Sequence, residues 1–492
     1  MGEIWGWTLS SDTPPYSLPA PSWGFPRWAF PFAPAPPKPQ GIPASAQCPI
    51  SIAFVLNLLN YRYIQQKKQL KLAAKMLFKN YSTMGDAMST DNSLATIDYI
   101  DNLYYRTTLD FSKGSHFEVG QAYAQAIVDT LPTFGATVDN FLYLSAKSAP
   151  ETPELSTLIT RSYNLISNMP QQYKDEMAGM ITIFNYPIDK LGDGILSSNE
   201  LLVYEVMHDV IDPGSCSAAA VYGNASATGS TIVGRNFDWY DIPGTSELHN
   251  VQIYLNNDST YDIVGIGFLG QLFPASVFSE NHISGALLDS DMKQGYFTTV
   301  GANSYPSDFR YAFEHFDSIG GVSYYLLGQQ DTHSYIAFLA DTNSAVVLEN
   351  DLEHPSSRGL RTSSSVLRDG ATWEIPNTVV AVNSFLLPGT TDEFTGEPSN
   401  TKRFASYSSL LSGDLLSQGS INMQDMQSIM SYAGSDGIAK NSGAIYRATN
   451  DYPTLQSYIL DMGSLELVAN FGPTSGNPPH PTYTQVFASS PF

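Results

Sequence analysis

The spacing of hydrophobic positions along the chain changes close to Cys216. Before this residue, apolar side chains recur every three or four positions, which is typical of helices with one buried face. The last predicted helix has a start signal in Ser197-Ser-Asn-Glu200, where serine and glutamate can each bond a free backbone amide. The pattern predicts helices at 50–77, 114–130, 152–168, 171–184 and 198–210.

After Cys216, apolar residues alternate with polar ones or occur in short blocks, which is typical of strands. Two helical stretches, 403–411 and 423–432, interrupt this pattern. Together the hairpins and helices predict an α+β fold with antiparallel sheets. The predicted strands and hairpins are 217–222, 230–233, 251–255, 263–268, 334–340 with 345–349, 378–382, and 455–460 with 465–471.

Residues 1–46 are rich in proline and also contain Trp5, Trp7, Trp23 and Trp28. So much proline excludes regular secondary structure and favours extended polyproline segments. We expect this arm to wrap its own domain, and an arm that binds a partner or touches a membrane is the alternative. The predicted organisation is therefore the arm at 1–46, a mostly helical segment at 47–215 and an α+β domain at 216–492.

Composition excludes several classes of protein. The net charge of -23 argues against nucleic-acid binding and against charge-driven binding to an anionic membrane. With only Cys48 and Cys216, at most one disulfide is possible and a multi-cysteine zinc site is not. We expect no metal and no cofactor. No integral membrane segment and no signal peptide is recognisable, so a lysosomal or secreted location and a cytoplasmic one both stay open.

The loop at 189–200 partly matches a calcium-binding loop between two helices. Asp189, Asp193, Gly194 and Glu200 fit that pattern, but Leu191 stands where an oxygen ligand belongs. A plain turn between helices is the favoured interpretation.

The stretch from Cys216 to Trp239 predicts a β-hairpin with its turn near Ser226. In that register Cys216 faces roughly Asn236, and residues directly opposite lie within ~5 Å. A thiol beside the guanidinium of Arg235 and the carboxylate of Asp238 is an arrangement typical of an activated nucleophile. An ordinary surface hairpin is the alternative. Because Arg235 and Asp238 are three positions apart, both reach the thiol only if the strand breaks near Phe237.

These residues also resemble a known family. A cysteine that begins a strand and is followed by Gly234-Arg-Asn-Phe-Asp-Trp239 is similar to the N-terminal-nucleophile hydrolases of the acid ceramidase, N-acylethanolamine acid amidase, choloylglycine hydrolase and penicillin acyltransferase group. The resemblance covers roughly 110–475. Its other segments are Gly114-Ser-His-Phe-Glu-Val-Gly120, Glu200-Leu-Leu-Val-Tyr-Glu-Val-Met-His208, Val382-Asn-Ser-Phe385, Thr401-Lys-Arg-Phe-Ala-Ser-Tyr-Ser-Ser-Leu410, Asp461-Met-Gly463 and Phe471-Gly-Pro473.

The resemblance implies an αββα sandwich that is made as an inactive precursor. Autocleavage of the Ser215–Cys216 bond would give a two-chain form, and the freed α-amine would act as the general base for its own thiol. The site residues carried over are Cys216 as nucleophile, Arg235 to favour the thiolate, Asp238 to hold the amine and thiol, Asn383 to donate to the oxyanion, and Arg403 to support the site. His208, the histidine nearest in sequence, is expected to be an ordinary helix residue.

The implied activity is hydrolysis of a linear, non-peptide amide in a small-molecule N-acyl compound or lipid. An acyltransferase or a phospholipase B-like lipid esterase of the same superfamily is one alternative, and a non-catalytic binding protein with the same fold is another. One departure from the family concerns an Asn or Glu near the site, in place of which this chain has Asp289 or Asp291. The proline-rich arm has no counterpart in the family.

Overall fold

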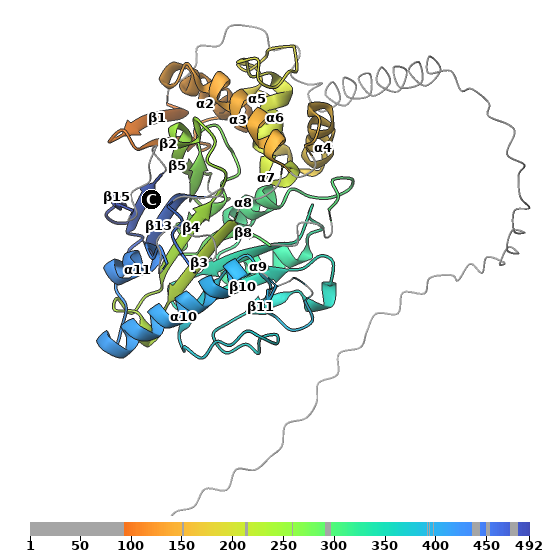
Figure 1. The fold of residues 1–492 in the computed structure, drawn as a ribbon. Helices are drawn as coiled ribbons and strands as arrows, with labels where there is room; N and C mark the ends of the chain where they lie inside the picture. The colour runs from red at the N-terminus through yellow and green to blue at the C-terminus, as the bar shows by residue number, and fades with distance from the viewer. Residues whose placement is uncertain are drawn as a thin grey trace, which may run out of the picture. The chain divides into compact units, whose positions relative to one another are not determined.

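The computed structural model describes residues 93–149, 152–211, 215–257, 259–290, 297–390, 392, 394–396, 398–434, 443–448, 453–472 and 481–492. The proline-rich arm, Cys48, the predicted helix at 50–77 and Asp291 lie outside the described residues. Within them the strands form two sheets with helices beside them, as Figure 1 shows.

The larger sheet has nine strands. All neighbouring strands are antiparallel except β2 and β5, which run parallel. Because β2 precedes Cys216 and β5 follows it, both parts of the chain contribute to one sheet. The strand order is β1 (Ala95–Ile100), β2 (Tyr104–Asp110), β5 (His249–Leu255), β6 (Ile263–Phe268), β7 (Ser276–Ser279), β8 (Ser284–Asp289), β9 (Tyr335–Ala340), β10 (Ala345–Asn350) and β11 (Gly359–Arg361).

The smaller sheet has six strands, and all its neighbouring pairs are antiparallel. Cys216 belongs to β3, which lies between β12 and β4. The strand order is β12 (Thr378–Ala381), β3 (Ser215–Val221), β4 (Ile232–Asp238), β13 (Thr454–Asp461), β14 (Leu467–Phe471) and β15 (Thr484–Phe487).

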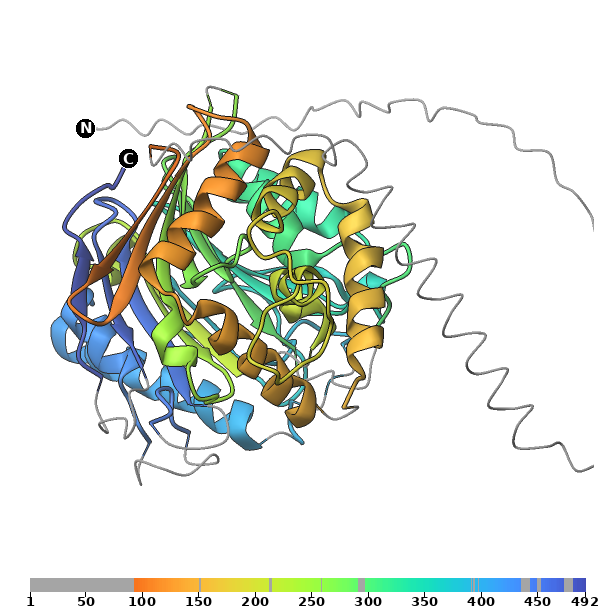
Figure 2. The same cartoon turned by 90° about the horizontal axis from the view of Figure 1, so that it is seen from above.

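Helices pack against the outer side of each sheet. The helices that precede Cys216 gather at the top of Figure 1, whereas α10 and α11 lie at the lower left, beside the smaller sheet. Figure 2 gives the same arrangement from above. The helices are α2 (His116–Thr130), α3 (Phe134–Ser148), α4 (Leu155–Asn168), α5 (Gln171–Met180), α6 (Ser198–Glu205), α7 (Met207–Val210), α8 (Tyr305–His315), α9 (Ile319–Gly328), α10 (Pro398–Gln418) and α11 (Met423–Met430).

Two glycines mark where a helix lies directly on a sheet. A Cβ atom on Gly285 of β8 would come within 2.6 Å of Phe313 in α8, and one on Gly234 of β4 within 2.6 Å of Met430 in α11. On their other sides the two sheets face each other, because Arg235 of β4 bonds the backbone oxygen of Leu287 in β8. The order helix, sheet, sheet, helix confirms the predicted α+β sandwich.

The segment before Cys216 is joined to the rest by a buried ionic network. Arg310 of α8 reaches Glu176 of α5 at 2.6 Å and Glu314 at 2.8 Å, and its guanidinium carbon lies 4.5 Å from the ring centres of Tyr173 and Tyr254. All five side chains are buried. Removing one partner of such a pair leaves a buried charge uncompensated, which costs about 3–5 kcal/mol.

After Cys216 the sequence pattern located most strands and α11 to within a few residues, but it found only the middle of α10 and missed α8, α9, β7, β8, β11 and β15. Before Cys216 it missed α3 and the β1–β2 hairpin, and it merged α6 with α7, which are separated at Val206. The capping box at Ser197 and Glu200 is present as predicted. The described part of this segment, 93–211 apart from 150–151, is therefore mostly helical, with one hairpin added to the larger sheet.

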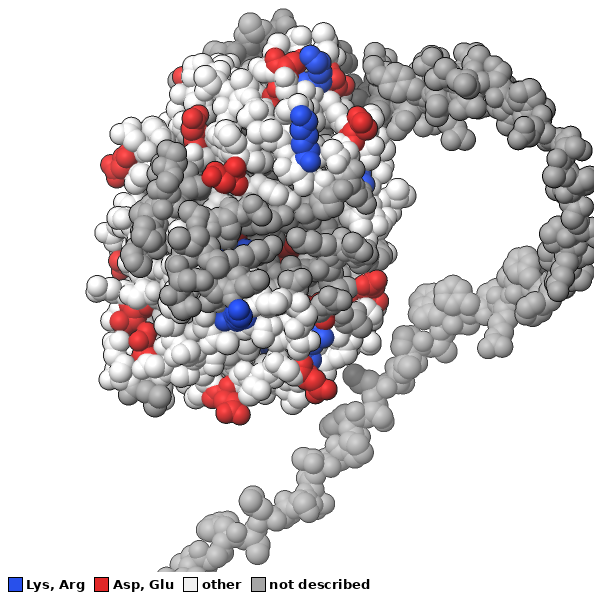
Figure 3. All heavy atoms as spheres, viewed as in Figure 1, with Lys and Arg blue, Asp and Glu red and all other residues white. Residues whose placement is uncertain are grey.

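The surface agrees with the composition. On the face seen in Figure 3 acidic side chains are scattered, basic ones are fewer, and no broad basic patch is visible. Among the described residues, no helix has the length and apolar character needed to cross a membrane.

Candidate active site

The β3–β4 hairpin sets the register of the site. Cys216 pairs with Phe237, not with Asn236 as the sequence had suggested. The connecting segment between the two strands contains a short 3-10 turn at Gly223–Ala225. The corrected register places Cys216, Phe237 and Arg235 on one face of the sheet, because side chains two positions apart on a strand share a face.

The thiol lies beside the guanidinium of Arg235. Nη2 of Arg235 is 3.5 Å from Sγ and also donates to the backbone oxygen of Leu287 at 2.7 Å, while Nη1 donates to Oγ of Ser276 at 2.6 Å. The guanidinium carbon is 4.9 Å from the ring centre of Phe237. Burial raises the pKa of the Cys216 thiol, and the positive charge of Arg235 opposes that rise. The arginine is therefore fixed from several sides and favours the thiolate.

Asp238 lies on the opposite face of the same strand. The predicted break near Phe237 is wrong, because β4 pairs with β3 without interruption as far as Asp238. The irregularity lies in the other neighbour, β13, between Thr454 and Gln456. The carboxylate of Asp238 consequently faces away from the thiol, and a direct contact between the two side chains is not part of the site.

Two arginines and a threonine hold the Asp238 carboxyl group. Nη1 of Arg403 lies 3.2 Å from Oδ2, Nε of Arg447 lies 3.6 Å from the same oxygen, and Oγ1 of Thr454 donates to Oδ1 at 2.7 Å. Burial raises the pKa of Asp238, whereas the charges of Arg447 and Arg403 and the hydroxyl of Thr454 lower it. These contacts favour the ionised carboxylate.

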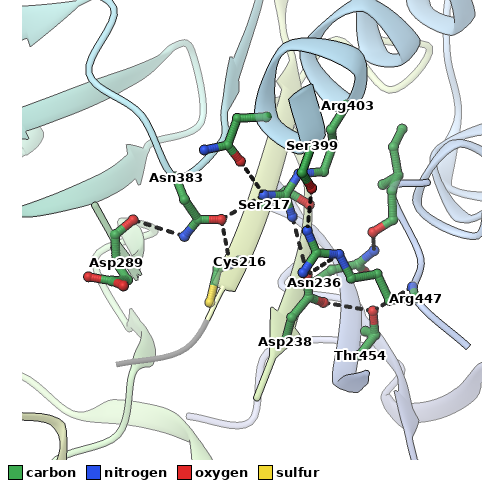
Figure 4. A network of polar contacts seen from close by, with 12 residues as sticks. Cys216, Ser217, Asn236, Asp238, Asp289, Asn383, Ser399, Arg403, Arg447 and Thr454 are labelled. Atoms are coloured by element: carbon green, nitrogen blue, oxygen red, sulfur yellow. Dashed lines mark hydrogen bonds and ion pairs between the residues drawn. The ribbon is translucent and has the colours of Figure 1, made fainter. Parts of the chain in front are cut away.

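The backbone nitrogen of Cys216 is held by a side chain. It donates to Oδ1 of Asn383 at 2.9 Å, and Nη2 of Arg403 donates to the same oxygen at 2.6 Å. Nδ2 of Asn383 donates to the backbone oxygen of Asp289 at 2.9 Å. Figure 4 shows the Asn383 amide between Cys216 and Asp289, with Arg403 behind it. Since arginine only donates and a backbone oxygen only accepts, these neighbours fix which end of the amide faces Cys216.

Asn383 is itself placed by buried carboxylates. Oε2 of Glu349 accepts from the backbone amides of Leu386 and Leu387, both at 2.8 Å, and Asp392 accepts from that of Phe385. Glu349 is in turn paired with Arg361 at 2.7 Å. The turn after β12 is therefore clamped to β10 and β11 of the other sheet, which fixes the position of Asn383.

The structure thus brings together all five predicted site residues: Cys216, Arg235, Asp238, Asn383 and Arg403. Sequence reasoning missed Arg447 and Thr454, which lie more than 200 positions from Asp238 and form no local motif with it. It also missed Ser399 and Asn400 at the start of α10, which bond Arg447 and Arg403 at 2.9 and 2.8 Å. Their polar side chains, which come just before Lys402 in the sequence, are the signal that could have indicated these site residues.

His208 does not serve as a base for the thiol. It lies in α7, as predicted, with its ring centre 4.9 Å from that of Trp239. Burial and the charge of Arg235 lower the pKa of His208 to about 3, so the ring is neutral. In the described part of the chain, the side chain that hydrogen-bonds the thiol is that of Arg235.

The loop at 189–200 forms the plain turn that the sequence favoured. The Asp189 carboxylate accepts from Ser197 and Asn199, and the Glu200 carboxylate accepts from two backbone amides. No group of three acidic, histidine or cysteine side chains able to hold a metal ion occurs in the described part of the chain.

Comparison with known proteins gives matches at the level of structure. No family model and no curated sequence matches the chain. The structure is similar to a mutant of the conjugated bile acid hydrolase from Clostridium perfringens, with a TM-score of 0.35, 12% identity, and 55% of this chain and 92% of that one covered. It is also similar to the Caenorhabditis elegans N-acylethanolamine-hydrolyzing acid amidase ortholog, with a TM-score of 0.35, 12% identity, and 50% and 93% covered.

A further similar structure is the penicillin V acylase from Agrobacterium tumefaciens, with a TM-score of 0.34, 10% identity, and 56% of this chain and 86% of that one covered. These proteins are of the kinds named by the resemblance in the sequence.

Proposed function

We propose that the protein is an autoprocessing cysteine amidohydrolase that cleaves a linear amide in a small N-acyl compound. The observation that carries this proposal is that both reactive atoms of Cys216 are held by side chains. Its sulfur is beside Arg235, and its backbone nitrogen is bonded to Asn383. A structural cysteine in a strand needs neither contact, whereas an N-terminal nucleophile needs its nitrogen and sulfur positioned together.

Processing begins when the thiol attacks the carbonyl carbon of Ser215. The carbon–nitrogen bond to Cys216 breaks, the nitrogen takes up a proton, and Ser215 is left as a thioester on sulfur. Water then hydrolyses the thioester, which leaves a carboxylate on Ser215 and a free α-amine on Cys216. This amine has an ordinary pKa near ~8, so it can accept the proton of its own thiol.

In the mature site the thiolate attacks the acyl carbon of the substrate amide. The protonated α-amine gives its proton to the leaving amine, and water releases the acyl group as a carboxylic acid. Arg235 favours the thiolate, while Asn383 and Arg403 keep the α-amine in place. Asp238 acts through Arg403, because its carboxylate faces away from the thiol.

Intact mass measurement tests this proposal. The purified chain should give two fragments divided between Ser215 and Cys216, and Cys216→Ala should remain a single chain. Cys48→Ala is the matched control, because it removes the other cysteine, and it should be cleaved normally. The processed protein should then hydrolyse N-acyl aminocoumarin amides of different chain length.

An uncleaved wild-type chain that is inactive on these amides at acid and neutral pH would overturn the proposal. A protein that passes the acyl group to an added amine faster than to water would be an acyltransferase with the same nucleophile.

A further inference from the structure

Arg447 is held by several polar contacts, as are the site residues that the sequence had indicated. Its Nε atom lies 3.6 Å from Oδ2 of Asp238, and Nη2 donates to Oγ of Ser399 at 2.9 Å. Its backbone amide donates to Oγ1 of Thr454 at 2.9 Å, and Thr454 bonds the other oxygen of Asp238. Arg447 is 4% exposed, so its charge acts in a poorly solvated environment. Figure 4 shows Arg447 and Arg403 on either side of the carboxylate.

The charges around Asp238 and Cys216 do not balance. The described contacts of these two residues bring three guanidinium groups to a single carboxylate, that of Asp238. His208 is neutral at ordinary pH, and burial also raises the pKa values of the nearby tyrosines, which are therefore neutral. The site carries a surplus of positive charge. The arginines are Arg235, Arg403 and Arg447, and the tyrosines are Tyr305, Tyr407, Tyr446 and Tyr458.

A single arginine already satisfies the geometry of the Asp238–Asn383 chain. Arg403 alone bridges the Asp238 carboxylate and Oδ1 of Asn383, which holds the nitrogen of Cys216. Arg447 adds no contact to Asn383 or Cys216 among its described bonds. What it adds to the site is a second positive charge on the carboxylate.

We propose that Arg447 is a positioning residue whose charge sets the lower pH limit of the reaction. Together with Arg403 it keeps Asp238 ionised, and the surplus charge keeps the freed nitrogen of Cys216 unprotonated and able to act as a base. This inference rests on the proposed function, since it assigns a role in the same site.

The sign of the effect is the same for both groups. Loss of a nearby positive charge raises the pKa of a carboxyl group and also that of an amine. Both changes move the acid limb of the pH–rate profile to higher pH. For a buried charge several ångströms away, Coulomb's law with the effective dielectric of a protein gives a shift of about one pH unit.

The experiment compares pH profiles of kcat/KM, which report the ionisations of the free enzyme. An N-lauroyl aminocoumarin amide serves as the probe for the processed wild-type protein, Arg447→Met and Arg447→Lys. Arg447→Met should shift the acid limb upward by about one unit and approach the wild-type rate on the alkaline side. Arg447→Lys retains the positive charge, so the acid limb of its pH profile should stay at the wild-type position.

Arg106→Met is the matched control. Arg106 is a partly buried arginine of β2 that bonds the backbone oxygen of Val486 and has no contact with the site, so its loss should leave the limb unchanged. If Arg447→Met does not accumulate as a folded chain, Arg447→Gln removes the charge while keeping a donor for Ser399, and it should shift the limb in the same direction.

A uniform loss of rate at every pH, or an unshifted limb in a charge-removing variant, would overturn this role for Arg447 and leave the proposed function standing. A wild-type chain that shows neither cleavage nor turnover would overturn both.

Discussion

The backbone nitrogen of Cys216 donates a hydrogen bond of 2.9 Å to Oδ1 of Asn383. The side-chain NH2 group of Asn383 donates to the backbone oxygen of Asp289, so the only donor group of this side chain points away from Cys216. Asn383 therefore holds the backbone nitrogen of Cys216 in the continuous chain. The oxyanion role that the family resemblance implies would require Nδ2 to leave Asp289.

Replacement of Asn383 by leucine should slow both processing and turnover. Leucine has a similar size but no acceptor, so the Cys216 amide and Arg403 each lose a partner. A buried donor without a partner costs about 1–3 kcal/mol, which corresponds to a rate about 5- to 150-fold lower. The rate of appearance of the two fragments on a gel measures the effect.

Asn383→Asp is the comparison, because it keeps the acceptor for Cys216 and Arg403 while it replaces the donor to Asp289 by a second, charged oxygen. It should be processed faster than Asn383→Leu. Equal rates in the wild type and Asn383→Leu would mean that the contact has no part in the reaction.

Arg235→Met should make the thiol less reactive. The charge of Arg235 opposes the rise in the Cys216 pKa that burial causes, so its loss should raise this pKa further. The thiolate fraction at neutral pH falls about tenfold for each unit. The measurement is the pH midpoint of alkylation by iodoacetamide, followed by mass, with Cys48→Ala as the background. The pH midpoint of alkylation for Arg235→Lys should lie between those of Arg235→Met and the wild type. Identical midpoints in all three proteins would exclude an effect of the charge.

Three buried aspartates, one in α7, one in α8 and one in the segment between α9 and β9, should make stability depend on pH. Burial raises the pKa of Asp209 to about 7 and that of Asp308 to about 6, and it raises that of Asp331 strongly. Because these values lie above those of the unfolded chain, the native state binds the protons more tightly. Their contribution is fully present below about pH 4 and is lost as the pH rises to about 7.

Asp331→Asn should therefore be more stable than the wild type near pH 8, and this advantage should shrink as the pH falls. Thermal unfolding at the two pH values measures the difference. Asp129→Asn, which changes an exposed carboxylate on α2, should show no such trend. An advantage of the same size at both pH values would show that the buried carboxyl group does not titrate in this range.

Gly120→Ala should destabilise the protein strongly. A Cβ atom there would lie 2.1 Å from the backbone oxygen of Glu176, where α2 crosses α5, and backbone cannot move aside as a side chain can. Gly135→Ala is the matched control, because its Cβ would meet only ordinary contact at 3.5 Å from Leu196. Alanine in a helix interior is favoured over glycine by roughly 0.5–1 kcal/mol, so the control should be neutral or stabilising. Denaturant unfolding of the two variants decides between these outcomes.

The sequence predicted best what neighbouring residues determine. The capping box of α6 lies within four residues and forms as the start signal at Ser197 indicates. The Gly-x-x-x-Glu-x-Gly segment also has a local explanation: Glu118 caps α2, and Gly120 allows α5 to approach. The β9–β10 hairpin was found because the short polar turn Asp341-Thr-Asn-Ser344 separates two apolar runs of strand length.

Prediction was weaker where a long connection or a distant contact decides the structure. The loop between β3 and β4 permits several registers, and a shift of one residue exchanges the two faces of a strand. For this reason the sequence placed Asp238 beside the thiol, whereas in the structure its side chain lies on the other face of the sheet. Arg447 has no neighbour in sequence that reveals its role, because its partner Asp238 comes from a strand more than 200 positions away.

The parallel pairing of β2 with β5 has a consequence for how the chain can be divided. Strands from before and after Cys216 lie side by side in one sheet, and Arg310 joins the two parts through Glu176. A break between Ser215 and Cys216 would thus separate the backbone without separating the sheet. Expressed as two genes, 1–215 and 216–492 would form a complementing pair. The second fragment, once its initiator methionine is removed, would begin at Cys216 with a free α-amine, which is the form that the proposed cleavage would produce.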